Sequence, residues 1–245
     1  MAAPRFYVGA ALDSLAIGHV VALPDVVAHH AVRVVRLGVG DTLTLFDGSG
    51  GEYAATLTAV DRRAAQARVD AFAPVERESA LRVTLVQAIA ANDAMDYAVR
   101  KAVELGASVI VPAITARSAP LPAGERTGKR VAHWQQIVIA ACEQCGRNRV
   151  PVVALPQPIA QWQPSAGQAA YVAAPEADLA LGSMPRPAAG CAIVIGPEGG
   201  LTAEEVASLA AQGAQRVSLG PRVLRTETAA VAALAILQAR WGDLA

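Results

Sequence analysis

Residues 192–205 read AIVIGPEGGLTAEE, and this stretch restricts the fold more than any other part of the 245-residue chain. Its first four residues are apolar and indicate a buried strand, which runs directly into a glycine loop. Thr202, with Glu205 three residues later, matches the capping box that begins many helices. The stretch therefore predicts a strand, a loop and a helix in direct succession, as in the sheet of an α/β domain.

A second unit of the same kind follows at residues 218–230, which read SLGPRVLRTETAA. A short strand is predicted at residues 216–219, and Thr226 is predicted to cap a long, alanine-rich helix. Earlier, residues 81–90 form a continuous apolar run that is typical of a strand buried on both faces. Because strands and helices alternate from about residue 80 onward, we expect a parallel α/β sheet in this part of the chain.

The N-terminal part of the chain has a different pattern. Residues 41–46, DTLTLF, alternate between polar and apolar side chains, and residues 47–51, DGSGG, are a strong hairpin turn. Further β-rich segments at similar spacing suggest a small barrel. Residues 73–79 are polar and contain a proline, which is typical of a linker. The sequence thus predicts two domains, a β-barrel over residues 1–74 and an α/β domain over residues 80–245.

Composition excludes some classes of protein. The chain carries 21 basic and 21 acidic residues, so no global positive field attracts nucleic acid non-specifically. Three cysteines provide no disulfide framework, and the spaced pair Cys142 and Cys145 is assigned to helix packing rather than to a metal. We see no apolar run that approaches the roughly 18 residues of a membrane span. A cytoplasmic protein is the expectation.

The loop at residues 196–200 does not have the chemistry of a phosphate site. A P-loop requires a lysine and a hydroxyl residue after its glycines, and a dinucleotide fold requires Gly-x-Gly-x-x-Gly; neither is present. Glu198 would also repel a pyrophosphate. The loop therefore favours a neutral or cationic ligand, or it is a tight turn without any ligand. A second Gly-Pro loop at residues 219–225 favours a pocket built largely from backbone.

The two loop motifs, IGPEGGLTAEE at residues 195–205 and LGPRVLRTETAA at residues 219–230, closely resemble those of the RsmE family. Members of this family are 16S ribosomal RNA uridine-N3 methyltransferases of the SPOUT class. Weaker agreement extends over nearly the whole chain. It includes RFYV at residues 5–8, LFDGSGGEY at residues 45–53 and ACEQCGRNRVP at residues 141–151.

The resemblance implies a fold, a cofactor and partners. Residues 1–74 would form a PUA-like RNA-binding β-barrel. Residues 80–245 would form a SPOUT-type α/β methyltransferase domain whose parallel sheet contains a deep trefoil knot. The cofactor would be S-adenosylmethionine, without a metal, and the substrate would be 16S ribosomal RNA of the small subunit. The family works as a homodimer with the active site near the dimer interface.

The resemblance also implies which residues hold the cofactor. The positive sulfonium and the lack of a phosphate in S-adenosylmethionine agree with loops that carry carboxylates rather than lysines. Nine residues of three loops are expected to bind it: Ala174, Pro175, Ile195, Gly196, Gly199, Leu219, Gly220, Val223 and Leu224.

The catalytic residues are assigned as a hypothesis. N3 of uridine carries a proton and becomes a good nucleophile only when that proton leaves. Arg225 would stabilise the resulting anion or hold a neighbouring phosphate, and Glu198 or Glu227 would assist proton removal, because these charged residues lie in the two loops. The structural alternative is that Arg225 only forms an ion pair with Glu227.

RNA binding requires basic side chains, and residues 117–149 have a local excess of positive charge. The alternative for these side chains is an ordinary solvated surface. The candidates for RNA contact are Arg5, Arg33, Arg36, Arg117, Arg147, Arg149 and Arg222.

The sequence is also compatible with two other functions. A related SPOUT enzyme could methylate the ribose 2′-oxygen of RNA, because its last loop can look similar. A protein of the same fold could also bind RNA, or assist ribosome assembly, without catalysis.

Overall fold

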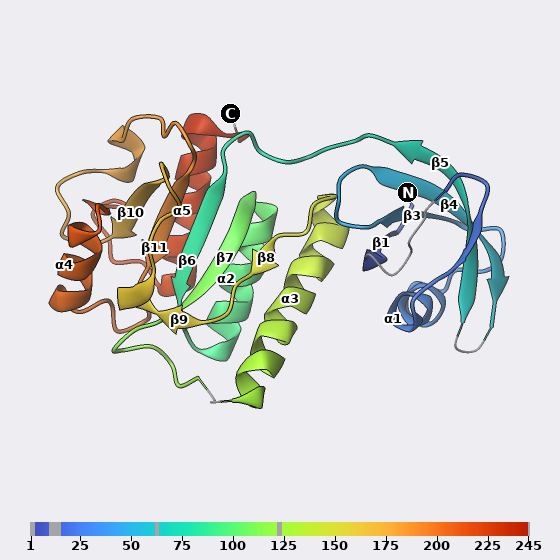
Figure 1. Cartoon of the computed structure of the whole chain (residues 1–245), viewed down its shortest axis with the longest axis horizontal. Coiled ribbons are helices and arrows are strands. Elements are labelled where there is room, and N and C mark those ends of the chain that lie inside the picture. Colours follow the sequence, from blue (N-terminus) through green and yellow to red (C-terminus); the bar gives the residue numbers. More distant parts are fainter. Residues whose placement is uncertain (1–2, 10–15, 62–63, 122–123, 245) are drawn as a thin grey trace. The chain divides into compact units, whose positions relative to one another are not determined.

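The computed structural model describes residues 3–9, 16–61, 64–121 and 124–244. The chain divides into two compact units (Figure 1). The first consists of Met1–Glu78 together with Cys142–Val150, and the second consists of Ser79–Ala141 together with Pro151–Ala245. The short segment at residues 142–150 thus belongs to the N-terminal unit, although it lies in the middle of the second unit in sequence.

The first unit contains a five-stranded sheet in the order β1-β3-β4-β5-β2. β1 pairs with β3 in parallel, and the other neighbours are antiparallel. Alternate residues of β5 are buried, so one face of the strand covers a core that includes Phe6, Leu45 and Leu57. The strands are β1 (Arg5–Tyr7), β2 (Val20–Ala22), β3 (Thr42–Phe46), β4 (Glu52–Val60) and β5 (Ala65–Ala73).

The β-rich character predicted for the N-terminal unit is confirmed. The predicted turn at residues 47–51 connects β3 to β4, and Gly48, Gly50 and Gly51 adopt positive φ there. The unit also contains α1 (Asp25–His29), which Pro24 precedes as N-cap, and the π-helical turn η2 (His30–Val34).

The second unit contains a seven-stranded sheet whose paired strands are all parallel. The order is β12-β10-β11-β6-β7-β8, and β9 pairs with β7. This confirms the parallel α/β prediction. The strands are β6 (Val83–Ala88), β7 (Ala107–Ile114), β8 (Val152–Val153), β9 (Gln157–Pro158), β10 (Ala169–Ala173), β11 (Cys191–Ile195) and β12 (Gln215–Val217).

Helices cover both faces of this sheet. Val86 of β6 belongs to a core cluster with Leu209 of α4, whereas its neighbour Gln87 bonds to Thr226 of α5. Because successive strand residues point to opposite faces, α4 and α5 lie on opposite faces of the sheet. α2 packs against α5 and β7. The helices are α2 (Asn92–Glu104), α3 (Glu125–Cys145), η3 (Ile159–Gln161), η4 (Leu181–Ser183), α4 (Ala203–Ala211) and α5 (Thr226–Trp241).

The two predicted helix starts have different outcomes. The capping box is confirmed, since the Thr202 hydroxyl accepts from the Glu205 N–H while the Glu205 carboxylate accepts from the Thr202 N–H. The prediction that Thr226 caps α5 is wrong. Arg225 is the N-cap residue, without a side-chain cap, and Thr226 is the first helical residue. Its buried hydroxyl donates instead to the Gly196 carbonyl, 2.6 Å away.

Two cysteines, Cys142 and Cys191, are buried and have unreactive thiols. Burial raises the pKa of the Cys142 thiol to about 12, and burial raises that of Cys191 to about 12 as well. Both thiols therefore stay protonated near neutral pH, in agreement with the packing role assigned to Cys142. Among the helices in the described ranges, none has the length and apolar composition needed to cross a membrane.

Candidate functional site

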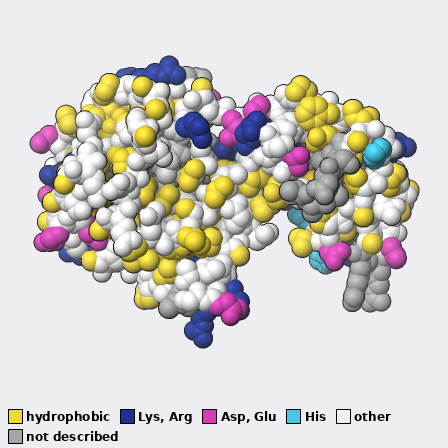
Figure 2. Space-filling model, in the orientation of Figure 1, with side chains coloured by type: hydrophobic (Ala, Val, Ile, Leu, Met, Phe, Trp, Pro, Cys, Tyr) yellow, Lys and Arg dark blue, Asp and Glu magenta, His cyan; other side chains and the backbone are white. Residues whose placement is uncertain are grey.

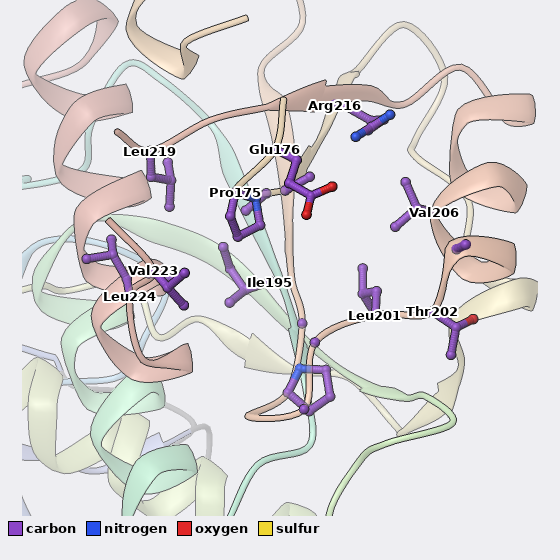
Figure 3. Close-up of a pocket in the computed structure, with 18 of the residues that line it drawn as sticks. Pro175, Glu176, Ile195, Leu201, Thr202, Val206, Arg216, Leu219, Val223 and Leu224 are labelled. Atoms are coloured by element: carbon purple, nitrogen blue, oxygen red, sulfur yellow. The ribbon is translucent and has the colours of Figure 1, made fainter. Parts of the chain in front are cut away.

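A cavity of about 790 Å³ lies in the second unit, where three neighbouring strands end (Figure 3). Its walls come from the loops that follow β10, β11 and β12 and from α4. β10 pairs with both β11 and β12 in parallel, so the three loops leave the sheet at the same edge. This is the edge at which open α/β sheets bind ligands, and the volume is in the usual range for a small-molecule site.

The sequence prediction for the cofactor loops agrees with the position of this cavity. All nine residues expected to bind the cofactor line it, although direct contact with a ligand stays a prediction. Leu219, Val223 and Leu224 form one side, near the start of α5, and Ile195 and Pro175 lie between that side and the other (Figure 3). The two glycine loops therefore come together as the sequence analysis expected.

The opposite side of the cavity was missed by the sequence analysis. Leu201, Thr202 and Val206 line it from α4 and the residues that lead into this helix, and Glu176 and Arg216 also reach the cavity (Figure 3). Part of this side had a signal in the sequence. The helix that a capping box begins must place one face near the preceding loop, so Val206 could have been included.

The backbone of the last loop offers free hydrogen-bonding groups. Within the described residues, no acceptor is found for the N–H groups of Leu219, Val223 and Leu224. Gly220 has φ of 113°, and a Cβ added there would meet no atom within 4 Å, so glycine leaves space beside this loop. Apolar walls and free N–H groups fit a nucleoside. The charged residues on the wall are two carboxylates, Glu176 and Glu198, and two arginines, Arg216 and Arg222.

The three catalytic candidates occupy different positions. Glu198 lines the cavity, but its Oε1 accepts a hydrogen bond from the Ala91 N–H at 2.8 Å. Arg225 and Glu227 do not line the cavity. Arg225 does, however, directly follow Leu224, which is a lining residue. The alternative of an ion pair between Arg225 and Glu227 is not found, since neither side chain has a polar partner within the described ranges.

The loop that follows β7 is bound both to the glycine loop and to the start of α4. Arg117 donates from Nη1 to the Gly199 carbonyl at 2.7 Å. The Ala116 N–H donates to Oε1 of Glu205 at 2.7 Å, while the other oxygen of this carboxylate closes the capping box. Arg117, a candidate for RNA contact, is exposed. One nitrogen of its guanidinium group, Nη1, is already bonded to the backbone of the glycine loop.

Arg147, one of the residues expected to contact RNA, is buried and paired with an acid. It belongs to the first unit, where Nε and Nη2 both donate to the Glu78 carboxylate, at 2.8 and 2.5 Å. Only 4% of the residue is exposed, so a phosphate could not reach its charge without breaking this pair.

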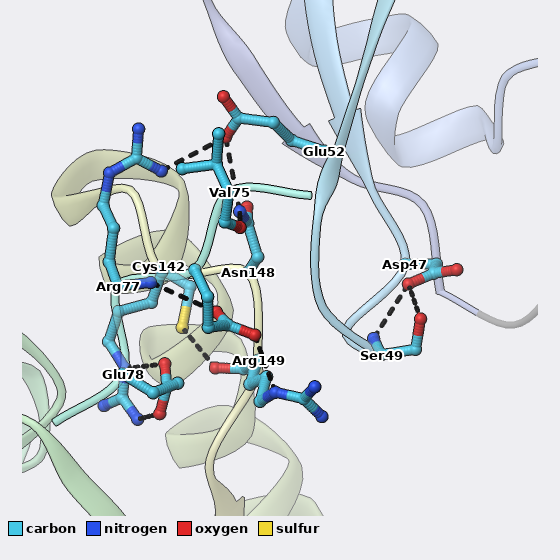
Figure 4. Close-up of polar contacts among 11 residues, drawn as sticks. Asp47, Ser49, Glu52, Val75, Arg77, Glu78, Cys142, Asn148 and Arg149 are labelled. Atoms are coloured by element: carbon cyan, nitrogen blue, oxygen red, sulfur yellow. Dashed lines mark hydrogen bonds and ion pairs between the residues drawn. The ribbon is translucent and has the colours of Figure 1, made fainter. Parts of the chain in front are cut away.

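Arg5 and Arg149 are also paired within the first unit. Arg5 forms an ion pair with Glu52 at 2.5 Å and donates to Oδ1 of Asn148. Arg149 donates from Nε to Glu76 at 2.7 Å and keeps more than half of its side chain exposed. Figure 4 shows part of this polar cluster, in which Glu52, Arg77, Glu78, Asn148 and Arg149 are labelled. A structural role explains Arg5, whereas Arg149 can reach solvent.

Arg33, Arg36 and Arg222 are exposed, and Arg222 lines the cavity. On the face drawn in Figure 2, basic side chains are scattered and often lie near acidic ones. RNA contact by Arg33, Arg36, Arg117, Arg149 and Arg222 stays a prediction.

Comparison with known protein families gives two matches that follow the two parts of the chain. A model described as an RNA methyltransferase domain matches residues 77–238, about two thirds of the chain. A model described as an RNA methyltransferase PUA domain matches residues 23–70. The first match contains every residue that lines the cavity.

Individual proteins agree over their full length. The ribosomal RNA small subunit methyltransferase E of Buchnera aphidicola is 30% identical, with 98% of each chain covered. The crystal structure of the Neisseria gonorrhoeae enzyme of the same name, bound to S-adenosyl methionine, is 38% identical, with a TM-score of 0.92 and 100% of both chains covered. A methyltransferase from Legionella pneumophila, in complex with the bound cofactor SAM, is 35% identical, with a TM-score of 0.95 and the same coverage.

Proposed function

Because the chain belongs to the family of ribosomal RNA small subunit methyltransferase E, we propose that it methylates N3 of a uridine in 16S ribosomal RNA, using S-adenosylmethionine. The observation that carries the proposal is the cavity at the ends of β10, β11 and β12. Its walls include all nine cofactor residues expected from the sequence, and similar structures from two organisms bind this cofactor.

The residues of the cavity fit the cofactor. The free N–H groups of Leu219, Val223 and Leu224 suit the acceptors of an adenine and a ribose, and the apolar side chains of the same loop suit the ring face. Glu176 is an exposed carboxylate on the wall, which favours a cation. When bound, the cofactor supplies a methyl group on positively charged sulfur.

Methylation at N3 requires the loss of the N3 proton. We assign Arg225 to the anion that remains, in which charge spreads to the flanking carbonyl oxygens, because its guanidinium has no partner within the described residues. Glu227, also without a side-chain partner, is assigned as the proton acceptor. Glu198 is better explained as a positioning residue, since its carboxylate already accepts the Ala91 N–H.

A homodimer is part of the proposal. α5 (Thr226–Trp241) is apolar around most of its circumference, and the half-buried residues Val231, Ala232, Ala235 and Ile236 remain on it besides the fully buried ones. A helix that is apolar on all sides is expected to be covered on all sides. A second copy of the chain would cover this face, as the family resemblance implies, and the cytoplasm is the proposed location.

The test is methyl transfer to RNA, followed by identification of the product nucleoside. Small-subunit particles and naked 16S RNA are incubated with the protein and methyl-labelled S-adenosylmethionine, and the digested RNA is analysed by mass spectrometry. We expect 3-methyluridine. A 2′-O-methylated nucleoside would instead support the ribose methyltransferase alternative, and cofactor binding without any transfer would support a non-catalytic RNA-binding protein.

A further inference from the structure

A buried chain of hydrogen bonds connects the sheet, the last helix and the glycine loop in the second unit. Gln87 of β6 donates from Nε2 to the Thr226 hydroxyl at 2.8 Å, and this hydroxyl donates to the Gly196 carbonyl at 2.6 Å. Gln87 is 0% exposed and Thr226 is 5% exposed. Gly196 lines the cavity, and Thr226 directly follows Arg225.

The direction of these bonds is fixed by chemistry. Nε2 of Gln87 also donates to the Ala88 carbonyl at 3.0 Å, and a carbonyl can only accept, so the amide group cannot be turned around. The Thr226 hydroxyl must therefore accept from Gln87, which leaves its single proton for Gly196. One threonine thus joins the start of α5 to the start of the glycine loop.

The arrangement includes an unsatisfied group. Oε1 of Gln87 is buried without a hydrogen-bond partner in the described part of the chain. A buried acceptor without a partner destabilises a fold, so an apolar side chain of similar size would serve packing at least as well. The two hydrogen bonds of Nε2 offset this cost, so the net effect of Gln87 on stability is small, and what the glutamine provides is a fixed position for the Thr226 hydroxyl.

We propose that Gln87 and Thr226 are positioning residues that hold the Gly196 carbonyl and the N-terminus of α5 at a fixed separation. Gly196 belongs to the cofactor loop, and Arg225 precedes the helix, so the pair sets the position of Arg225 relative to the bound cofactor. This inference rests on the proposed function of the cavity, which it deepens. Neither side chain lines the cavity, so both act through the groups that they hold.

The main test is Thr226→Val, which keeps the shape of the side chain and removes the hydroxyl group. We expect the dissociation constant for S-adenosylmethionine, measured by calorimetry, to rise about tenfold, which is the effect of about 1.4 kcal/mol. We expect kcat for RNA methylation to fall at least as much. Thr226→Ser keeps the hydroxyl and should stay within about threefold of the wild type in both quantities.

Thr228→Val is the matched control, because Thr228 is an exposed threonine in the same first turn of α5 and does not line the cavity. We expect its cofactor affinity to match that of the wild type. Equal losses in Thr228→Val and Thr226→Val, or wild-type affinity and turnover in Thr226→Val, would overturn the proposal.

Gln87→Met separates positioning from folding, and it also covers the case in which Thr226→Val fails to fold. Removal of the unsatisfied Oε1 should leave the melting temperature equal or higher, while cofactor affinity and kcat fall by about threefold or more. If Gln87 served folding alone, cofactor affinity and kcat would fall only when the melting temperature also falls. That result would contradict the proposal.

Hydrogen exchange gives a readout that does not depend on activity. Without cofactor, the amides of residues 196–202 and of the first turn of α5 should exchange faster in Thr226→Val and Gln87→Met than in the wild type. Unchanged exchange would contradict the proposal. If exchange changes as expected but the wild type transfers no methyl group to RNA, the proposed function fails while the positioning role is retained.

Discussion

Arginines are used in opposite ways in two regions of the molecule. In the first unit, Arg147 pairs with Glu78 and Arg149 pairs with Glu76, within the polar cluster shown in Figure 4. In the second unit, Arg222 on the cavity wall and Arg225 at the start of α5 are exposed, and neither side chain has a partner among the described residues. All four are arginines in turns or loops, so the difference lies in their neighbours.

The difference separates residues that stabilise the fold from residues that remain available for a ligand. An arginine held by a carboxylate has its charge balanced, and a phosphate would have to displace the acid. An exposed arginine without a partner has no such competitor. On this reasoning Arg222 and Arg225 are the stronger candidates for contact with the substrate, and Arg147 and Arg149 are the weaker ones.

The largest expected effect is on stability. Arg147→Met should lower the free energy of unfolding by about 3 kcal/mol, because it leaves the Glu78 carboxylate partly buried without its partner. The measurement is urea unfolding at neutral pH. Arg149→Met is the matched control and should cost about 1 kcal/mol or less, since that pair is more exposed. Equal stability of the two variants would break the assignment of Arg147 to the fold.

The next effect is on catalysis. Arg225→Ala should lower kcat by about 100-fold, the usual loss when a group that stabilises developing charge is removed. The dissociation constant for S-adenosylmethionine, measured by calorimetry, should change by less than about threefold, because Arg225 does not line the cavity. Arg225→Lys keeps the charge and should recover part of the rate. Turnover close to that of the wild type would remove Arg225 from the mechanism.

Much of the fold could be predicted because its signals are local. The apolar run in β6, the turn glycines at residues 47–51 and the capping box at Thr202 each depend on residues close together in sequence. The glycine loops were placed correctly at one cavity for a related reason. Because the strands of this sheet are parallel, the loops that follow β11 and β12 leave the sheet at the same edge, although β10 lies between these strands.

The errors concern partners that are distant in sequence. Thr226 has the local character of a cap, but it bonds to Gly196, 30 residues away, and to Gln87, 139 residues away. Arg147 lies in a basic segment that is typical of RNA binding, but its guanidinium group pairs with Glu78, which is 69 residues away in sequence. No local pattern marks such pairs, because only the tertiary fold decides which residues meet.

A smaller effect is expected on RNA affinity. Arg222→Ala should weaken binding of 16S RNA and reduce the slope of log affinity against log salt by about 1, as expected for one lost phosphate contact. Arg5→Ala should leave that slope unchanged, because Arg5 is paired with Glu52. Affinities measured between low and moderate salt give both slopes. The reverse result, with a lower slope for Arg5→Ala only, would invert the comparison between the two regions.

The smallest expected effect is on the pH dependence of stability. Burial raises the pKa of Glu52, but hydrogen bonds from Arg5, Arg77 and Asn148 lower it more, so the pKa lies below its ordinary value of 4.5. A carboxylate with a lowered folded-state pKa stabilises the fold fully above pH 4.5, and this contribution is lost as the pH falls further.

Glu52→Gln should therefore cost about 1 kcal/mol at neutral pH, because the glutamine oxygen can still accept the hydrogen bonds while the charge is lost. It should also reduce the loss of stability below pH 4.5, as measured by urea unfolding across pH. Glu104→Gln, which removes a carboxylate from the Lys101 pair in the second unit, is the control. If both variants lose stability on acidification as the wild type does, the contacts of Glu52 do not stabilise the first unit. Arg5, the partner of Glu52, would then be as available to RNA as Arg222 and Arg225.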